Sequence, residues 1–208
     1  VFPKAWIREK NSFSLLKNGN SRAVENEILA SKICRCFDCR QVLYEESMFD
    51  GQKVSKSRII TSVDYSMVSM EAFEIYAANH DIHVMDFVLK LDAYTYYMMN
   101  LLDYLIGNTD RHWGNWGFLV DNRTNQPVRL FDLMDLNQTF LAYDTPDGAN
   151  CMTTGNRKMS QREAAVEAVK KIGLNQRAEI KDEWFKGREK EREMFWCRFG
   201  ILKEQWKA

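Results

Sequence analysis

Apolar positions recur with helical spacing over residues 84–106, the longest such pattern in the chain. The positions that follow the i, i+3, i+4, i+7 rule are Val84, Phe87, Val88, Leu91, Tyr94, Met98, Leu101, Leu102 and Leu105. Gly107 and Asn108 come next, and both residue types commonly end helices. The pattern predicts one long helix that buries an apolar face and holds the polar loop after it in a fixed place.

The first third of the chain alternates short apolar stretches with polar turns, which is typical of strands. Strands are predicted over residues 5–8, 13–17, 41–45 and 54–61, with turns at 9–12 and 49–52. A helix is predicted over residues 22–34, with Ser21 as its N-cap. Another helix is expected over residues 70–78, and a short buried strand over residues 116–120, before a turn at 121–127.

The last third is helical by pattern. Ser160 and Glu163 form the S-x-x-E capping box of a helix that extends to about residue 172, and Gly173 ends it. One or two further helices are predicted over residues 175–206. Phe195, Phe199, Leu202 and Trp206 share one face of that pattern. This face is expected to pack on the rest of the protein rather than on a membrane or a partner.

Composition narrows the class of protein. The 208 residues carry 29 basic and 29 acidic side chains, so the formal net charge is zero and no basic excess points to nucleic acid. No apolar run reaches membrane-spanning length, and no leader pattern opens the chain. Five irregularly spaced cysteines suit the reducing cytoplasm, which is the predicted location. Cys34, Cys36 and Cys39 are interpreted as packing residues, since the paired C-x2-C elements of a zinc site are missing.

Oxygen-bearing side chains cluster in two loops after the long helix. Asp110 and Asn115 lie five positions apart, and Asp132 and Asp135 follow the next turn. Phosphoryl transfer needs a carboxylate that orients the attacking hydroxyl and hard oxygen ligands for Mg²⁺. The pair alone has an ordinary alternative, because Asp and Asn are also common turn residues.

The run Asn108-Thr-Asp-Arg-His-Trp-Gly-Asn-Trp-Gly-Phe118 resembles the catalytic loop of the HipA-like serine/threonine kinases, and a similar D-R-H-x-x-N run occurs in phosphatidylinositol kinases. The resemblance extends to about Ala142. It implies that Asp110 is the catalytic aspartate and Asn115 a Mg²⁺ ligand. The second metal aspartate is assigned to Asp135, because Asn137-Gln138 resembles the family's polar continuation, and Asp132 is the alternative.

The same resemblance assigns the nucleotide-binding residues. Lys17 would bind the α/β-phosphates of ATP and pair with Glu27. The alternative is that both are solvated surface charges. Lys4 would end a glycine-rich phosphate loop that is expected upstream of Val1. Ile60 would lie at the crossover between lobes, where backbone groups hold adenine. Residues 143–158 would form an activation or substrate-binding segment.

The expected fold is therefore α+β and two-lobed, like a protein kinase. Residues 1–62 would form a small strand-rich lobe, with truncation at its start left open, and residues 63–208 a larger helical lobe. The expected activity is ATP- and Mg²⁺-dependent transfer of the γ-phosphoryl group to a serine or threonine of a protein, with an antitoxin-type protein as a further partner. The alternatives are a small-molecule or lipid kinase and a non-catalytic nucleotide- or partner-binding module. His112 is expected to support the loop by hydrogen bonding, with Trp113 and Trp116 packing, and Gly114 and Gly117 allowing a tight turn.

Overall fold

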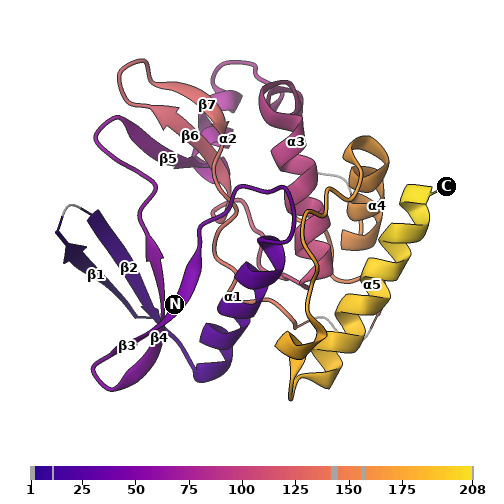
Figure 1. The fold of residues 1–208 in the computed structure, drawn as a ribbon. Coiled ribbons are helices and arrows are strands. Elements are labelled where there is room, and N and C mark those ends of the chain that lie inside the picture. Colours follow the sequence, from indigo (N-terminus) through magenta and orange to yellow (C-terminus); the bar gives the residue numbers. More distant parts are fainter. Residues whose placement is uncertain (1–2, 11, 142–144, 156–157, 208) are drawn as a thin grey trace.

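The computed structural model describes residues 3–10, 12–141, 145–155 and 158–207 (Figure 1). Its first part is a four-stranded antiparallel sheet in the order β1-β2-β4-β3. The strands are β1 (Lys4–Glu9), β2 (Ser12–Asn18), β3 (Tyr44–Phe49) and β4 (Gln52–Arg58). Helix α1 (Ser21–Cys34) follows β2 and lies against β3 and β4. The four strands and the helix predicted for this part are confirmed.

Two boundaries differ from the prediction. The N-cap of α1 is Asn20 rather than Ser21, since the Asn20 side chain accepts a hydrogen bond from the Ala23 N–H. Strand β3 begins at Tyr44 rather than at residue 41. Gln41 is instead held by Ser31 of α1, whose hydroxyl donates to its side chain and whose carbonyl accepts from it. The backbone next to Gln41 pairs with Leu133 rather than with β4, since the Val42 N–H donates to the Leu133 carbonyl at 2.9 Å.

A second antiparallel sheet has the order β5-β6-β7. It consists of β5 (Tyr65–Ser69), β6 (Gly117–Asp121) and β7 (Gln126–Leu130). The predicted strand at 116–120 is β6, shifted by one residue. Strand β5 was not predicted, because its five residues carry little apolar patterning and its partner β6 lies about fifty positions later in the chain. Among the described residues, no strand belongs to both sheets. The division into two lobes near residue 62 stays our proposal.

The helices after α1 are α2 (Met70–Ala78), α3 (Val84–Leu105), α4 (Gln161–Ile172), the 3₁₀ helix η1 (Asp182–Phe185) and α5 (Glu189–Lys207). Two helices, α2 and α3, pack against this second sheet, and α4 and α5 pack against α3 on the side away from it (Figure 1). The capping box of Ser160 and Glu163 and the helix end at Gly173 are confirmed. The prediction for Trp206 is wrong, because this residue is 59% exposed near the end of α5, while Phe195, Phe199 and Leu202 are buried.

The long helix α3 is interrupted at Asp92, where the backbone leaves the helical region (φ −155°, ψ 63°). The Asp92 carboxylate accepts hydrogen bonds from the Thr95 N–H, from Arg40 and from the Leu130 N–H. It therefore caps the second half of α3 and attaches it to β7. The sequence pattern predicted one continuous helix, because the apolar positions keep their helical spacing on both sides of Asp92 and do not show that this residue acts as a cap.

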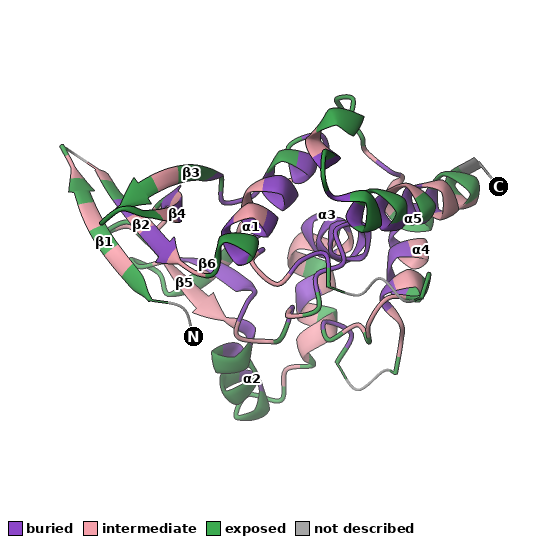
Figure 2. Cartoon of the chain, turned by 90° about the horizontal axis from the view of Figure 1, so that it is seen from below, coloured by how far each residue is buried: buried purple, intermediate pink, exposed green. Residues whose placement is uncertain are grey.

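The second half of α3 is the centre of the hydrophobic core. Leu101, Leu102, Tyr104 and Leu105 are fully buried, and the same cluster includes residues of α1, α4, α5 and β6. In Figure 2, α3 lies in the centre and is mostly buried (purple), whereas the outer elements carry more exposed (green) and intermediate (pink) residues. Burial from all sides fixes the end of α3, and with it the position of the loop that begins at Ile106.

Gly117 lies where β6 meets β5, and a Cβ there would come 2.1 Å from the Val68 carbonyl oxygen. The close backbone approach, rather than the tight turn that we expected, explains this glycine. Gly117→Ala is expected to lower the free energy of unfolding by about 3 kcal/mol, because backbone must move. Gly200→Ala in α5 is the control, since nothing lies within 4 Å of its Cβ position. Equal urea midpoints for the two variants would contradict the prediction.

Candidate active site

Lys17 connects two acidic side chains from distant parts of the chain. Its Nζ donates to Glu27 Oε1 of α1 at 2.8 Å and to Asp135 Oδ1 at 2.9 Å. Ser55, opposite Lys17 in the sheet register, also donates to Glu27. Lys17 is 6% exposed and Glu27 1%, so their interpretation as solvated surface charges is wrong. A buried ammonium between two carboxylates is a paired charge.

Lys17 and Asp135 each stabilise the charged form of the other. Burial alone would lower the pKa of Lys17, but Tyr44, Glu27 and Asp135 together raise it well above its ordinary value. Burial alone would raise the pKa of Asp135, but Lys17 holds it below its ordinary value. Both groups therefore carry their charges at neutral pH.

Tyr44 completes this arrangement, although nothing in the sequence pointed to it. Its ring centre lies 5.0 Å from Lys17 Nζ, and its hydroxyl accepts a hydrogen bond of 3.0 Å from the Asp135 N–H. Asp135 has a left-handed backbone with φ 56°. Asp is one of the non-glycine residue types that adopt this region most readily.

The loop after α3 holds Asp110 and Asn115 together. Asn115 Nδ2 donates to the Asp110 carbonyl at 2.8 Å and to Asp110 Oδ2 at 3.3 Å. The Asp110 side chain stays 45% exposed. His112 Nδ1 accepts from the Gly114 N–H at 3.0 Å, which confirms its expected role as a support for the loop. A Cβ on Gly114 would lie 2.9 Å from the His112 ring, so glycine leaves room for this contact.

Arg111 joins the two loops, a role that the D-R-H-x-x-N run did not indicate. Its Nε and Nη2 donate to the Asp103 carboxylate of α3 at 2.8 and 3.0 Å. Its Nη1 donates to the carbonyls of Asn115 and Met134, both at 2.7 Å. Asp103 also accepts from Asn108. Because Met134 precedes Asp135, one buried guanidinium sets the Asp110 loop against the Asp135 loop.

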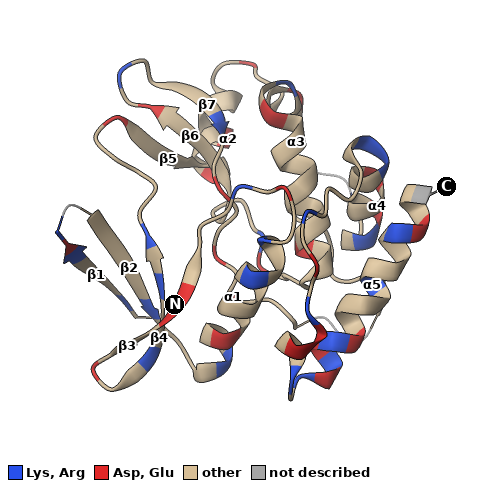
Figure 3. Cartoon of the chain, in the orientation of Figure 1, with Lys and Arg blue, Asp and Glu red and all other residues tan. Residues whose placement is uncertain are grey.

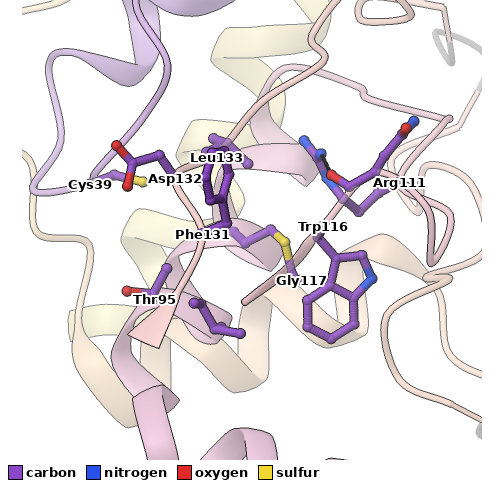
Figure 4. A pocket seen from close by; sticks show the side chains of 11 residues that line it. Cys39, Thr95, Arg111, Trp116, Gly117, Phe131, Asp132 and Leu133 are labelled. Carbon is purple, nitrogen blue, oxygen red and sulfur yellow. Dashed lines mark hydrogen bonds between the residues drawn. The ribbon is translucent and has the colours of Figure 1, made fainter. Parts of the chain in front are cut away.

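The two candidate metal aspartates lie in different surroundings. Asp132 accepts a hydrogen bond of 2.6 Å from Arg129. It lines a cavity of about 10 Å³ with Cys39 and Thr95, on the side away from Arg111 and Trp116 (Figure 4). This is the space of about one water molecule. Asp135 instead faces Lys17, and its side chain is 23% exposed. The geometry therefore favours Asp135 over Asp132 as a ligand near a nucleotide.

The other two predicted binding residues are less closely involved. Lys4 is exposed on β1, opposite Lys17 in the register, and its charge contributes to the lowered pKa of Asp135. Ile60 is half-buried after β4 and packs against the core. Its assignment to the adenine site stays a prediction.

The oxygen atoms available in this region suit Mg²⁺. In the described part of the chain, neither Asn115 Oδ1 nor Asp135 Oδ2 accepts a hydrogen bond. Asn115 is held by the hydrogen bond that its Nδ2 donates to the Asp110 carbonyl, and Asp135 by the hydrogen bond that its Oδ1 accepts from Lys17. Mg²⁺ usually binds one or two such protein oxygens with nucleotide phosphates and water. No group of three or more His, Cys, Asp or Glu residues suited to a metal occurs among the described residues.

A groove of about 880 Å³ lies beside the Asp110 loop. Trp113 from that loop, Met85 and Tyr97 of α3, and Met152 line it, among other residues. Trp113 Nε1 donates to the Met152 carbonyl at 2.8 Å. Met152 belongs to the predicted activation or substrate-binding segment, of which residues 143–144 and 156–157 lie outside the described part. The described part of that segment forms one wall of the groove.

The fold is that of a two-lobed, kinase-like protein. The chain is similar to the Helicobacter pylori proinflammatory kinase CtkA (TM-score 0.64, 15% identity), with 98% of this chain matched to 90% of that one. It is also similar to HipA from the Shewanella oneidensis MR-1 toxin–antitoxin complex of HipA, HipB and operator DNA (TM-score 0.55, 11% identity). That match covers 99% of this chain and 66% of HipA.

At these identities the likeness establishes the fold, and the resemblance to HipA-like kinases is confirmed at that level. No protein-family model and no curated protein matches the sequence. No helix among the described residues has the length and apolar character needed to cross a membrane.

Proposed function

We propose that this protein is a kinase that transfers the γ-phosphoryl group of ATP to the hydroxyl of a serine or threonine in a protein, with Mg²⁺ as cofactor. One observation carries the proposal: a buried lysine bridges a helix glutamate and a loop aspartate that are far apart in the sequence. Burying Lys17 and Glu27 costs free energy that their pairing must offset, so a buried ion pair is weak evidence of a stabilising role and supports a functional one such as phosphate binding.

Each residue has a role in this proposal. Lys17 binds the α/β-phosphates, and Glu27 holds its ammonium in place. Asn115 and Asp135 supply oxygen ligands for Mg²⁺, which neutralises charge on the phosphates when bound. Asp110 accepts a hydrogen bond from the acceptor hydroxyl and orients its oxygen. Its exposure beside Asn115 suits a group that must meet a substrate.

The groove beside Trp113 favours a polypeptide acceptor. It is partly open to solvent and is lined by side chains of α3 and of the segment that contains Met152, which gives an extended acceptor segment a surface to lie on. The similar structure of HipA was solved together with HipB, and this supports a further protein partner of the antitoxin type for this chain. Five free cysteines, among them the exposed Cys197, support a reducing, cytoplasmic location.

The proposal is tested with radiolabelled ATP and a panel of acceptors that includes the protein itself, basic and acidic proteins, small alcohols and lipid vesicles. Label on serine or threonine of a protein is expected. Label only on a small molecule or a lipid would favour the alternative kinase classes. ATP binding that is independent of Mg²⁺, with no transfer to any acceptor, would favour the non-catalytic module.

A matched pair of substitutions tests which aspartate binds the metal. Asp135→Asn is expected to lower kcat/KM by about 10²-fold, because one charged group at the phosphates is lost. It should also shift the Mg²⁺ dependence to higher concentration. Asp132→Asn removes an equal charge three residues away and is expected to stay within about threefold of the wild type, because its carboxylate pairs with Arg129. The reverse order of effects would assign the metal to Asp132.

A further inference from the structure

A buried polar network attaches the start of α5 to the start of α1. Arg188 donates to the Glu191 carboxylate (Nε 3.3 Å, Nη2 3.2 Å) and, through Nη2, to Asn26 Oδ1. Glu191 also pairs with Arg22. Arg22 and Asn26 are four positions apart and therefore share one face of α1. Figure 1 shows α1 and α5 beginning at the same edge of the molecule, and Figure 3 shows charged residues gathered at the start of α5.

Asn26 carries this attachment to the segment that contains Asp135. Its Nδ2 donates to the Thr139 carbonyl at 2.8 Å, and the Thr139 hydroxyl donates to the Leu136 carbonyl at 2.8 Å. Asn26 is 2% exposed and Thr139 is fully buried. The Arg188 guanidinium lies 5.3 Å from the Phe140 ring centre. One amide thus links α5, α1 and the loop four residues after Asp135.

The two halves of α1 are held in different ways. Leu29, Ala30, Ile33 and Cys34 in the second half belong to the main hydrophobic core. Ala23 and Val24 in the first half are buried but lie outside that cluster. Glu27 lies next to Asn26, at the boundary between these halves. The distance between Glu27 and Asp135, which Lys17 must bridge, therefore depends on these polar contacts as well as on apolar packing.

We infer that Arg188 and Glu191 are positioning residues that hold the first half of α1 where Glu27 and Asp135 can bind Lys17 together. The inference deepens the proposed function by naming a control point for the same site. Arginine suits this role, because its planar group donates to Asn26 and Glu191 at the same time, which a lysine ammonium does less well. A protein or a modification that acts on the start of α5 would reach the lysine through this network.

Chemical labelling of Lys17 tests the inference without assuming any activity. Lysines of the intact protein are acetylated with acetic anhydride and analysed by mass spectrometry, and Cys34 is probed in parallel with iodoacetamide. Arg188→Met is expected to speed the labelling of Lys17 by about tenfold, because a charged hydrogen-bond network is lost from the helix start. Cys34, which is fully buried in the second half of α1, should stay unreactive.

Two further variants make the result specific. Arg192→Met removes an arginine one turn later in α5 that pairs with the exposed Asp182, so Lys17 labelling should equal that of the wild type. Glu191→Gln keeps the side-chain shape and is expected to give a smaller increase than Arg188→Met. This variant carries the test if Arg188→Met does not fold. If Arg188→Met and Glu191→Gln fold but leave the rate of Lys17 labelling unchanged, the inference is overturned. It is also overturned if the labelling of Cys34 rises in parallel with that of Lys17 in both variants.

Nucleotide binding separates this inference from the proposed function. If the protein is a kinase, Arg188→Met should also weaken the binding of MgATP by about tenfold, and Arg192→Met should not. Faster Lys17 labelling without any MgATP binding in the wild type would keep the positioning role and reject the kinase. MgATP binding with unchanged labelling and unchanged affinity in Arg188→Met would reject the positioning role and keep the kinase.

Discussion

Asp110→Ala is expected to lower kcat by about 10³-fold, the usual effect of losing a group that orients and receives a proton from the attacking hydroxyl. The fold should survive, because the side chain is 45% exposed. Asn115 keeps its shorter hydrogen bond, which goes to the Asp110 backbone carbonyl rather than to the carboxylate. The measurement is phosphoryl transfer at saturating MgATP, with the melting temperature recorded alongside.

Asp64→Ala is the control for this change. Asp64 is also a loop carboxylate, 48% exposed, and it pairs with Arg123. Its removal should leave kcat within about twofold of the wild type, as expected for an exposed ion pair. Equal activity of Asp110→Ala and Asp64→Ala would refute the role of Asp110.

Arg111→Met is expected to lower the free energy of unfolding by about 3–5 kcal/mol, the largest stability effect that we predict, because Asp103 is left buried without its partner. Both side chains are nearly inaccessible, at 3% and 5% exposure. Urea denaturation measures the change. Activity should fall as well, since the carbonyls of Asn115 and Met134 lose the donor that holds the two loops together.

A second substitution shows whether the stranded charge is the cause. Arg111→Met combined with Asp103→Asn removes that charge and keeps an oxygen that accepts from Asn108. The double variant should recover about 1–2 kcal/mol relative to Arg111→Met. If the double variant is less stable than the single one, burial of an unpaired carboxylate is not the reason for the loss.

Much of the fold followed from local pattern. The two N-terminal hairpins, α1, α2, the capping box of α4 and the long helix before the Asp110 loop were predicted to within a few residues. These elements depend on periodicity, turns and caps, which are properties of neighbouring residues. Strand β5 and the break at Asp92 were missed, because both depend on partners far away in the sequence: β6 for the strand, and Arg40 and β7 for Asp92.

The candidate site divides in the same way. The motif around Asp110 and Asn115 is contiguous, so the sequence was enough to single it out. The resemblance already favoured Asp135 over Asp132 as the metal ligand, and that assignment stays our proposal. Only the structure showed that these residues, three apart in one segment, face Lys17 in one case and Arg129 in the other. Tyr44 had no sequence signal, since it acts through the Asp135 N–H, which any residue could supply. Arg111 lies in the D-R-H-x-x-N run, but the run did not indicate its partners Asp103 and Met134.

The sequence by itself determined which chemical groups this protein has and the short-range elements that carry them: a strand lysine, a helix glutamate and two loops rich in Asp and Asn. Only the tertiary structure decided that the predicted pair of Lys17 and Glu27 extends to Asp135, that Arg111 joins the loops, and that Arg188 contacts Asn26 of α1. The physical reason is that the partners of a buried charge are set by the packing of the whole protein around it. This packing brings together residues that are far apart in the sequence.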